Sequence, residues 1–250
     1  MPRFDADYVP RSAMAIYAHP DDIEFTVAGT VAKWARAGCE VTIVLLTSGN
    51  AGTHDRKFTR KTLERERERE ERESARILGV ARVVFLRGDD CELVSTLVLR
   101  RELVRRIRKA RPEVVLCNDP QALFFGDQYV NHPDHRAAGL AALEAVFPCA
   151  EMELLWPEAG APHKVHAVYV SSTPSPNIWI DVTETIDVKI AALSAHRSQL
   201  GDRDISPRIY GWAMDEALRA PARKVAGKRS TARPKYAEAF RVMRLLREDA

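Results

Sequence analysis

The stretch Met14-Ala-Ile-Tyr-Ala18 decides the fold, because this short apolar run leads directly into the polar residues His19-Pro-Asp-Asp22. An apolar run of this length, bounded by polar residues, is typical of a buried strand. The residues that follow, 25–36, have a helical pattern that ends near Gly38. The first polar motif is therefore predicted to lie in a loop between a strand and a helix.

The same alternation of strands and helices continues along the chain. Short apolar runs predict strands at 41–46, 83–86 and 114–117, and weaker patterns predict two more at 167–171 and 178–182. Helical patterns occupy 62–78, 96–110, 133–146 and 185–200, and 236–246 is interpreted as a terminal helix. Pro133 suits the first turn of its helix. We expect one domain over residues 1–250, with a C-terminal extension from about 201.

Strands that alternate with helices imply crossover connections. The expected fold class is therefore α/β, with a mostly parallel, Rossmann-like sheet and helices on both faces. In such sheets, sites form beyond the carboxyl ends of the strands. The loops at 19–22, 47–52, 89–90 and 119–135 all follow predicted strands. We therefore expect these four loops to open on one rim of the sheet and to share a site.

The composition excludes several classes of protein. The 38 basic and 35 acidic residues nearly balance, so the sequence predicts no nucleic-acid partner. The four cysteines form no Cys-x-x-Cys pair, which argues against a disulfide framework or a cysteine zinc site and favours a reduced, cytoplasmic setting. Residues 1–11 lack the apolar stretch of a secretory signal, and no run approaches the ~18 apolar residues of a membrane span. We therefore expect no membrane partner.

Two segments carry the residue types of a zinc hydrolase. Such an enzyme needs about three protein ligands, usually histidine and carboxylate, with one position left open for water. His19 and Asp22 can supply two ligands from a single turn, and either His132 or His135 can supply the third. The spacing alone does not choose between these two histidines. Asp21 is left free to act as a base.

The chemistry expected of this set is hydrolysis of an amide or an ester. Zinc lowers the pKa of a bound water to about 7, and a neighbouring carboxylate can take its proton as the water attacks a carbonyl carbon. A single histidine would more simply be an ordinary loop residue. Two His-Pro-Asp motifs at converging strand ends favour the metal site instead.

The motifs also indicate a family. Ala18-His-Pro-Asp-Asp-Ile-Glu-Phe25 together with Asn131-His-Pro-Asp-His-Arg136 resembles the LmbE-like, or PIG-L, family of zinc-dependent de-N-acetylases. The resemblance covers most of the chain. It also includes the loop 46–52, the arginine-rich helix that ends at Gly79, and Ala195-His-Arg-Ser-Gln199. It implies an LmbE-like fold and Zn²⁺ as cofactor. Related enzymes often form trimers or hexamers of identical chains, but the oligomeric state is not legible in this sequence.

The resemblance assigns roles by position. It implies that His19, Asp22 and His135 bind zinc and that Asp21 is the general base. His132 would then be the second catalytic group, which steadies the oxyanion or protonates the leaving amine, and Asp134 would orient His132.

Two residues are candidates for substrate binding. Arg67 lies on the inward stripe of its helix, together with Glu70, and matches an arginine that the family places near substrate. Substrate contact and a structural ion pair account equally well for it. Asp90 falls where related enzymes hold sugar hydroxyls, although it could simply end a strand in a turn. Asn50 replaces a glutamate common in the family, a difference that bears on substrate more than on zinc.

The expected function is removal of an acetyl group from an N-acetylglucosamine-type sugar or conjugate, which releases acetate and a free amine. One alternative within enzymes is hydrolysis of another acyl amide on a non-sugar scaffold. An alternative from a different class is a non-catalytic module that binds an acidic ligand through the basic segment from Arg219 to Lys235. The group attached to the sugar and the metal used in the cell are not legible in the sequence.

Overall fold

A central sheet organises the computed structural model, which describes residues 4–80, 82–221, 224–225, 228–229 and 233–245. Within these residues the sheet has seven strands in the order β3-β2-β1-β4-β7-β11-β8. The pairs from β3 to β7 are parallel, and β11 is antiparallel to both β7 and β8. The expected mostly parallel sheet is confirmed. Its strands are β1 (Ser12–Tyr17), β2 (Glu40–Thr47), β3 (Arg82–Gly88), β4 (Val114–Asn118), β7 (Ala167–Ser171), β8 (Ile178–Asp181) and β11 (Ala237–Arg244).

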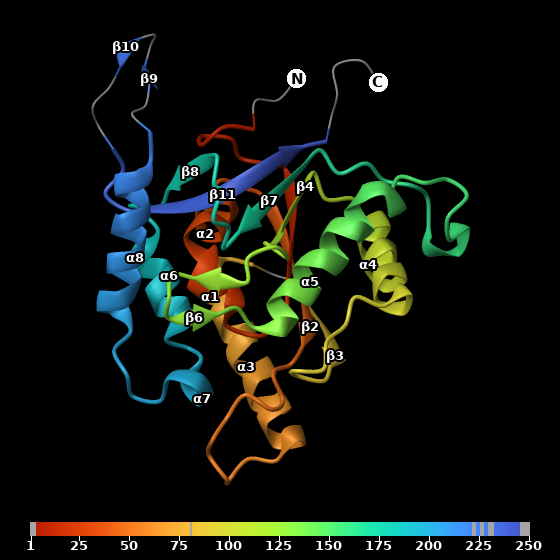
Figure 1. Cartoon of the computed structure of the whole chain (residues 1–250), viewed down its shortest axis with the longest axis horizontal. Helices are drawn as coiled ribbons and strands as arrows, with labels where there is room; N and C mark the ends of the chain where they lie inside the picture. Colours follow the sequence, from red (N-terminus) through yellow and green to blue (C-terminus); the bar gives the residue numbers. More distant parts are fainter. Residues whose placement is uncertain (1–3, 81, 222–223, 226–227, 230–232, 246–250) are drawn as a thin grey trace.

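Helices cover both faces of this sheet, with α2, α6 and α8 at the left of Figure 1 and α4 and α5 at the right. Side chains alternate along each strand, so that Ala15 and Tyr17 of β1 join the core beneath α2 and α6, while Met14 and Ile16 join the core beneath α4 and α5. The helices are α1 (Asp22–Thr26), α2 (Ala28–Arg36), α3 (Arg60–Leu78), α4 (Leu97–Ala110), α5 (Pro133–Glu144), α6 (Ile186–Leu193), α7 (Arg197–Leu200) and α8 (Ser206–Arg219).

The strand order reverses direction at β1. The chain steps outward from β1 to β2 and β3 on one side, and β4 pairs with the other edge of β1. Loops that leave β1 and β4 at their carboxyl ends therefore diverge, which leaves the crevice where α/β sheets bind their ligands. The loop after β1 carries His19, and the loop after β4 leads to His132.

The predicted terminal helix at 236–246 is wrong, because this segment forms the strand β11. Its alanine, glutamate and methionine content favours a helix in isolation. The segment instead fills the gap between β7 and β8, whose edges would otherwise present unpaired backbone groups. Burial alternates as in a strand, with Phe240 and Val242 inside and Arg241 and Met243 exposed. Tertiary pairing therefore outweighs local propensity here.

Smaller differences affect the rim of the sheet. The predicted helix at 25–36 divides into α1 and α2 at Val27, and the predicted helix at 185–200 divides into α6 and α7. Helix α8 and a short hairpin formed by β5 (Phe124–Phe125) and β6 (Tyr129–Val130) were not expected. Part of the basic segment from Arg219 to Lys235 lies outside the described residues. No described helix combines the length and apolarity needed to cross a bilayer.

Candidate metal and catalytic site

The first half of the site is a tight turn between β1 and α1. The Asp22 carboxylate accepts hydrogen bonds from the backbone N–H groups of Ala18 (3.1 Å) and His19 (2.9 Å), which closes the turn around it. Asp21 adopts φ 92°, in the left-handed region that is unfavourable for residues with a side chain. Strain of this kind is concentrated at functional sites, where the surrounding contacts maintain it.

The second half of the site is the start of α5. His132 is the N-cap residue and Pro133 occupies the first turn, where its missing N–H leaves no hydrogen bond unmade. His135 lies on this first turn, and its Nε2 is 3.0 Å from Asp22 Oδ1. Ligand atoms of His19, His132 and His135 lie within 4.8 Å of one another. The two sequence motifs therefore converge, as their strand-end positions predict.

The types of donor suit a zinc ion. The Asp22 carboxylate lies 3.0 Å from His135 Nε2 and 3.6 Å from His19 Nδ1. The other ring nitrogen of His19, Nε2, is 3.1 Å from Asp90 Oδ1 and 3.2 Å from Asp134 Oδ2. Metal-binding histidines usually donate their second ring N–H to a carboxylate in this way.

The electrostatics of the site favour a bound cation. Burial opposes ionisation of Asp22, but the neighbouring imidazoles of His135 and His19 outweigh it and hold the pKa of this carboxyl well below its usual range. Burial also disfavours a proton on His19, yet Asp134, Asp22 and Asp90 outweigh burial and raise its pKa well above normal. The concentration of negative charge thus attracts positive charge, whether protons or a metal ion.

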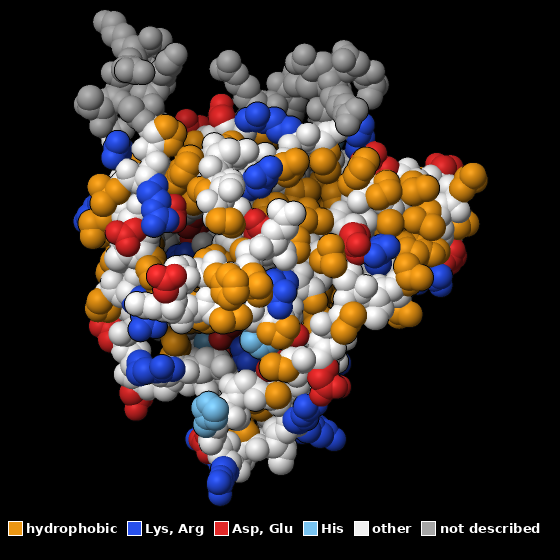
Figure 2. Space-filling model, viewed as in Figure 1, with side chains coloured by type: hydrophobic (Ala, Val, Ile, Leu, Met, Phe, Trp, Pro, Cys, Tyr) orange, Lys and Arg blue, Asp and Glu red, His pale blue; other side chains and the backbone are white. Residues whose placement is uncertain are grey.

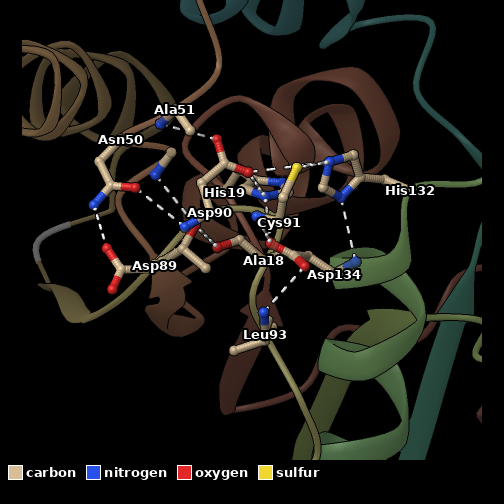
Figure 3. A network of polar contacts seen from close by, with 12 residues as sticks. Ala18, His19, Asn50, Ala51, Asp89, Asp90, Cys91, Leu93, His132 and Asp134 are labelled. Carbon is tan, nitrogen blue, oxygen red and sulfur yellow. Dashed lines mark hydrogen bonds and ion pairs between the residues drawn. The ribbon is translucent and has the colours of Figure 1, made fainter. Parts of the chain in front are cut away.

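The carboxylate of Asp134 has other partners than the ring of His132. It is completely buried and accepts hydrogen bonds from the backbone N–H groups of Cys91 (2.8 Å) and Leu93 (3.3 Å), in addition to its contact with His19 (Figure 3). A bond from this carboxylate to the ring of His132 is not among the described contacts. The reason is that the loop after β3 brings unpaired N–H groups next to it, which the sequence does not reveal.

His132 is oriented by backbone instead. Its Nδ1 accepts a hydrogen bond from the N–H of Asp134 (3.2 Å), so the neutral ring carries its hydrogen on Nε2. This Nε2 lies 3.3 Å from the sulfur of Cys91, as Figure 3 shows. Burial and the charges of His19 and His135 lower the pKa of His132. These effects favour the neutral ring, which donates through its Nε2–H.

Asp21 is paired with a buried arginine. Arg67, only 3% exposed, donates from Nη2 to Asp21 Oδ2 (3.2 Å) and to the carbonyl of Pro20 (2.6 Å), and from Nη1 to the carbonyl of Gly49 (3.1 Å). A side chain at Gly49 would lie 2.0 Å from Nη1, so glycine is required there. Burial raises the pKa of Asp21, and Arg67 opposes that effect.

Asp90 is almost completely buried. Its backbone N–H donates to Asn50 Oδ1 (3.1 Å), and its Oδ2 accepts from the N–H of Ala51 (3.3 Å). Burial opposes its ionisation, but the contact with His19 outweighs it and lowers the pKa to about 2. Asp90 therefore connects the loops after β2 and β3 to the loop after β1. This agrees with the prediction that these loops open on one rim of the sheet.

Sequence reasoning missed a buried cluster behind the site. Glu24, Glu71 and His196 are all inaccessible to solvent, and His196 Nε2 lies 3.5 Å from Glu24 Oε2 and 3.8 Å from Glu71 Oε2. The helical stripe that carries Arg67 and Glu70, both buried as predicted, could have indicated Glu71. His196 lies in Ala195-His-Arg-Ser-Gln199, which the family resemblance includes, but its contacts with Glu24 and Glu71 join segments distant in sequence.

The site is open to solvent on the face drawn in Figure 2, where histidine side chains are visible in a hollow. Hydrophobic side chains lie above that hollow, near the place of β6 in Figure 1. Phe124, Tyr129 and Val130 of the hairpin are all more than half exposed. The hollow therefore has both polar and apolar surfaces available to a ligand.

Fold and site together define an α/β enzyme with a histidine–carboxylate centre at the switch point of a mostly parallel sheet. The profile of the PIG-L family, described as GlcNAc-PI de-N-acetylase, matches residues 14–146, which include both motifs. The chain belongs to this family, whose members hydrolyse amides. The resemblance seen in the sequence is thereby confirmed, and an enzyme replaces the non-catalytic module as the class of this protein.

Individual relatives are deacetylases of N-acetylated sugars. The chain is 37% identical over 195 residues to the diacetylchitobiose deacetylase of Thermococcus kodakarensis, covering 76% of this chain and 70% of that one. It is 29% identical to a probable N-acetyl-α-D-glucosaminyl L-malate deacetylase 2 of Bacillus anthracis, covering 77% and 83%. The structure of N,N'-diacetylchitobiose deacetylase from Pyrococcus horikoshii matches with a TM-score of 0.82 and 29% identity, over 96% of this chain and 88% of that one.

Proposed function

We propose that this protein is a zinc-dependent deacetylase that removes the acetyl group from an N-acetylglucosamine-type sugar or conjugate. In this proposal His19, Asp22 and His135 hold the metal. The observation that carries it is the position of the Asp22 carboxylate between two imidazole nitrogens, with Asp21 next to it in sequence. A zinc ion held there would supply the Lewis acidity that polarises an amide carbonyl and activates water near neutral pH.

Asp21 is the proposed general base. It takes a proton from the water that attacks the amide carbon, and its strained backbone and its bond from Arg67 hold the carboxylate in one position. The two terminal nitrogens of the Arg67 guanidinium donate to three acceptors of the protein itself. We therefore assign Arg67 to positioning Asp21, in preference to direct contact with substrate.

His132 is the proposed second catalytic group. Its neutral ring presents Nε2–H, the type of donor that stabilises a developing oxyanion. The proton that Asp21 takes from the water can then pass to the leaving amine. The bond between its Nδ1 and the backbone of Asp134 keeps this nitrogen directed away from α5. Asp134 itself supports His19 and the loop after β3.

The substrate class follows from the relatives. Two of them are named for diacetylchitobiose and for a glucosaminyl malate, both of which carry an acetylated amine on a glucose-type ring. Asp90 is the carboxylate proposed to bind a sugar hydroxyl, and the exposed hairpin provides an apolar surface for the ring or its attached group. A different acyl amide on a non-sugar scaffold is the alternative substrate.

Two variants and one substrate panel test this function. His19→Ala should lose both zinc, measured by elemental analysis of the purified protein, and deacetylation. Asp21→Asn should keep zinc and lose activity by a factor of about 10² to 10⁴, the usual contribution of a general base. Asp202→Asn, which alters an exposed aspartate outside the site, is the control and should retain both.

The panel compares N-acetylglucosamine, diacetylchitobiose, an N-acetylglucosaminyl malate, their propionyl analogues, and acetylated amines without a sugar, assayed for released amine. We expect the acetylated sugars to react fastest. Full activity in Asp21→Asn would refute the assigned mechanism. Faster release of amine from the non-sugar amides would favour the alternative substrate, an acyl amide on a non-sugar scaffold.

A further inference from the structure

Asn131 lies immediately before the second motif, and the proposed function gives it no role. It is 3% exposed, and its side chain is fully used inside the protein. Its Nδ2 donates to the carbonyl of Ala122 (2.7 Å), and its Oδ1 lies 3.1 Å from Nδ1 of His135. Its backbone N–H donates to the carbonyl of Leu123 (2.8 Å).

These contacts leave little freedom in how the amide is oriented. A carbonyl oxygen can only accept, so the amide nitrogen of Asn131 must face Ala122 and its oxygen must face His135. The oxygen can only accept as well. Nδ1 of His135 must therefore carry a hydrogen and donate it to Asn131.

The consequence reaches the opposite side of the imidazole ring. In a neutral histidine with a hydrogen on Nδ1, the other nitrogen, Nε2, has a free lone pair. Nε2 of His135 is the atom that lies 3.0 Å from Asp22. Asn131 thus selects the tautomer in which His135 can bind a metal ion through the nitrogen that faces Asp22.

Asn131 also connects this histidine to the surface of the hollow. Ala122 and Leu123 immediately precede β5, and Asn131 immediately follows β6, so its bonds close the base of the hairpin. The same amide therefore joins the hairpin to His135. A change that releases the amide would free both the ring of His135 and the base of the hairpin.

We propose that Asn131 is a positioning residue that sets the tautomer of His135 for metal binding and anchors the β5–β6 hairpin beside it. The inference rests on the proposed function, because it assumes that His135 binds the metal. A residue that supports a metal ligand in this way typically contributes 10- to 100-fold to metal affinity.

Zinc affinity, measured by competition with a chromogenic chelator, tests this role separately from activity. Asn131→Leu keeps a similar volume and loses both side-chain bonds, so its affinity for zinc should fall about 10- to 100-fold. Asn131→Asp keeps an acceptor for His135 and should retain affinity to within about threefold of the wild type. The control is Asn177→Leu, which removes an asparagine that bonds the backbone of Val242 in the same two-sided manner. It should leave zinc affinity unchanged.

The wild-type protein supplies a second measurement that needs no variant. Long-range ¹H–¹⁵N spectra of the histidine rings in the zinc-loaded protein distinguish the two tautomers, and we expect His135 to carry its hydrogen on Nδ1. A hydrogen on Nε2, or equal zinc affinity in Asn131→Leu and the wild type, would overturn this inference and leave the proposed function intact. Failure of the wild type to bind zinc would overturn both.

Discussion

Replacing Arg67 with Met removes the guanidinium that lies behind Asp21. The methionine side chain fills much of the same volume but supplies no hydrogen-bond donor. Three acceptors then lose their partner: the Asp21 carboxylate, the carbonyl of Pro20 and the carbonyl of Gly49. Because the side chains of Arg67 and Asp21 are only 4% and 14% exposed, water cannot easily replace the lost bonds.

Breaking a buried ion pair by removing one partner typically costs about 3 to 5 kcal/mol. We expect Arg67→Met to lose about this much of its free energy of unfolding, which is a large fraction of the ~5–15 kcal/mol available to a folded protein. The effect on catalysis has a definite sign. Arg67 lowers the pKa of Asp21, so its loss raises that pKa, and the acidic limb of the activity profile should move to higher pH.

Urea unfolding of five proteins measures the stability part. The wild type is compared with Arg67→Met, with Asp21→Asn, with the double variant that combines the two, and with Arg69→Met. Arg69 lies on the same helix, is exposed, and pairs with Glu66, so its loss should cost less than about 1 kcal/mol. In the double variant the unpaired buried charge is gone, and we expect an interaction energy of about 0.5 to 3 kcal/mol between the two sites.

Two results would contradict this role of Arg67. One is a free energy of unfolding of Arg67→Met no lower than that of Arg69→Met, and the other is simple addition of the losses in Arg67→Met and Asp21→Asn. Either result would mean that the guanidinium does not stabilise the Asp21 carboxylate. An activity profile whose acidic limb stays in place would separately show that Arg67 does not influence the ionisation of the base.

Two other predictions concern carboxylates outside the proposed metal and catalytic residues. Lys189 and Glu238 form a buried pair at 2.7 Å that joins α6 to β11, and Lys189→Met should lower the free energy of unfolding in urea by about 3 to 5 kcal/mol; a loss below about 1 kcal/mol would contradict this. Burial opposes ionisation of Glu113, but hydrogen bonds from the Tyr8 hydroxyl and the Arg11 N–H outweigh burial and lower the pKa of Glu113. The ionised Glu113 therefore contributes to the free energy of unfolding above the unfolded pKa of about 4.3. This contribution is lost as the pH falls through the lower pKa of the folded state. Thermal unfolding between about pH 3 and about pH 7 should therefore depend less steeply on pH in Glu113→Gln than in the wild type, and identical slopes would exclude this role.

Much of the architecture is determined by the sequence alone. The apolar runs that end at His19 and Asn118 have the length and residue types of buried parallel strands, and the helical patterns between strands require crossovers. Those local features suffice to place both His-Pro-Asp motifs at one edge of the sheet, because the carboxyl ends of parallel strands lie on the same side. The family resemblance then distinguished His135 from His132, which periodicity could not do.

Only the tertiary structure decided which partner each polar side chain takes. Asp134 contacts the backbone of Cys91, 43 residues away, and Arg67 contacts Asp21, 46 residues away. The segment of β11 forms a strand because it pairs with β7 on one side and with β8 on the other. Hydrogen-bond partners depend on distances between segments that come together only when the sheet forms. A local pattern specifies the direction of a side chain from its own backbone, and it contains no information on which distant donor or acceptor will face it.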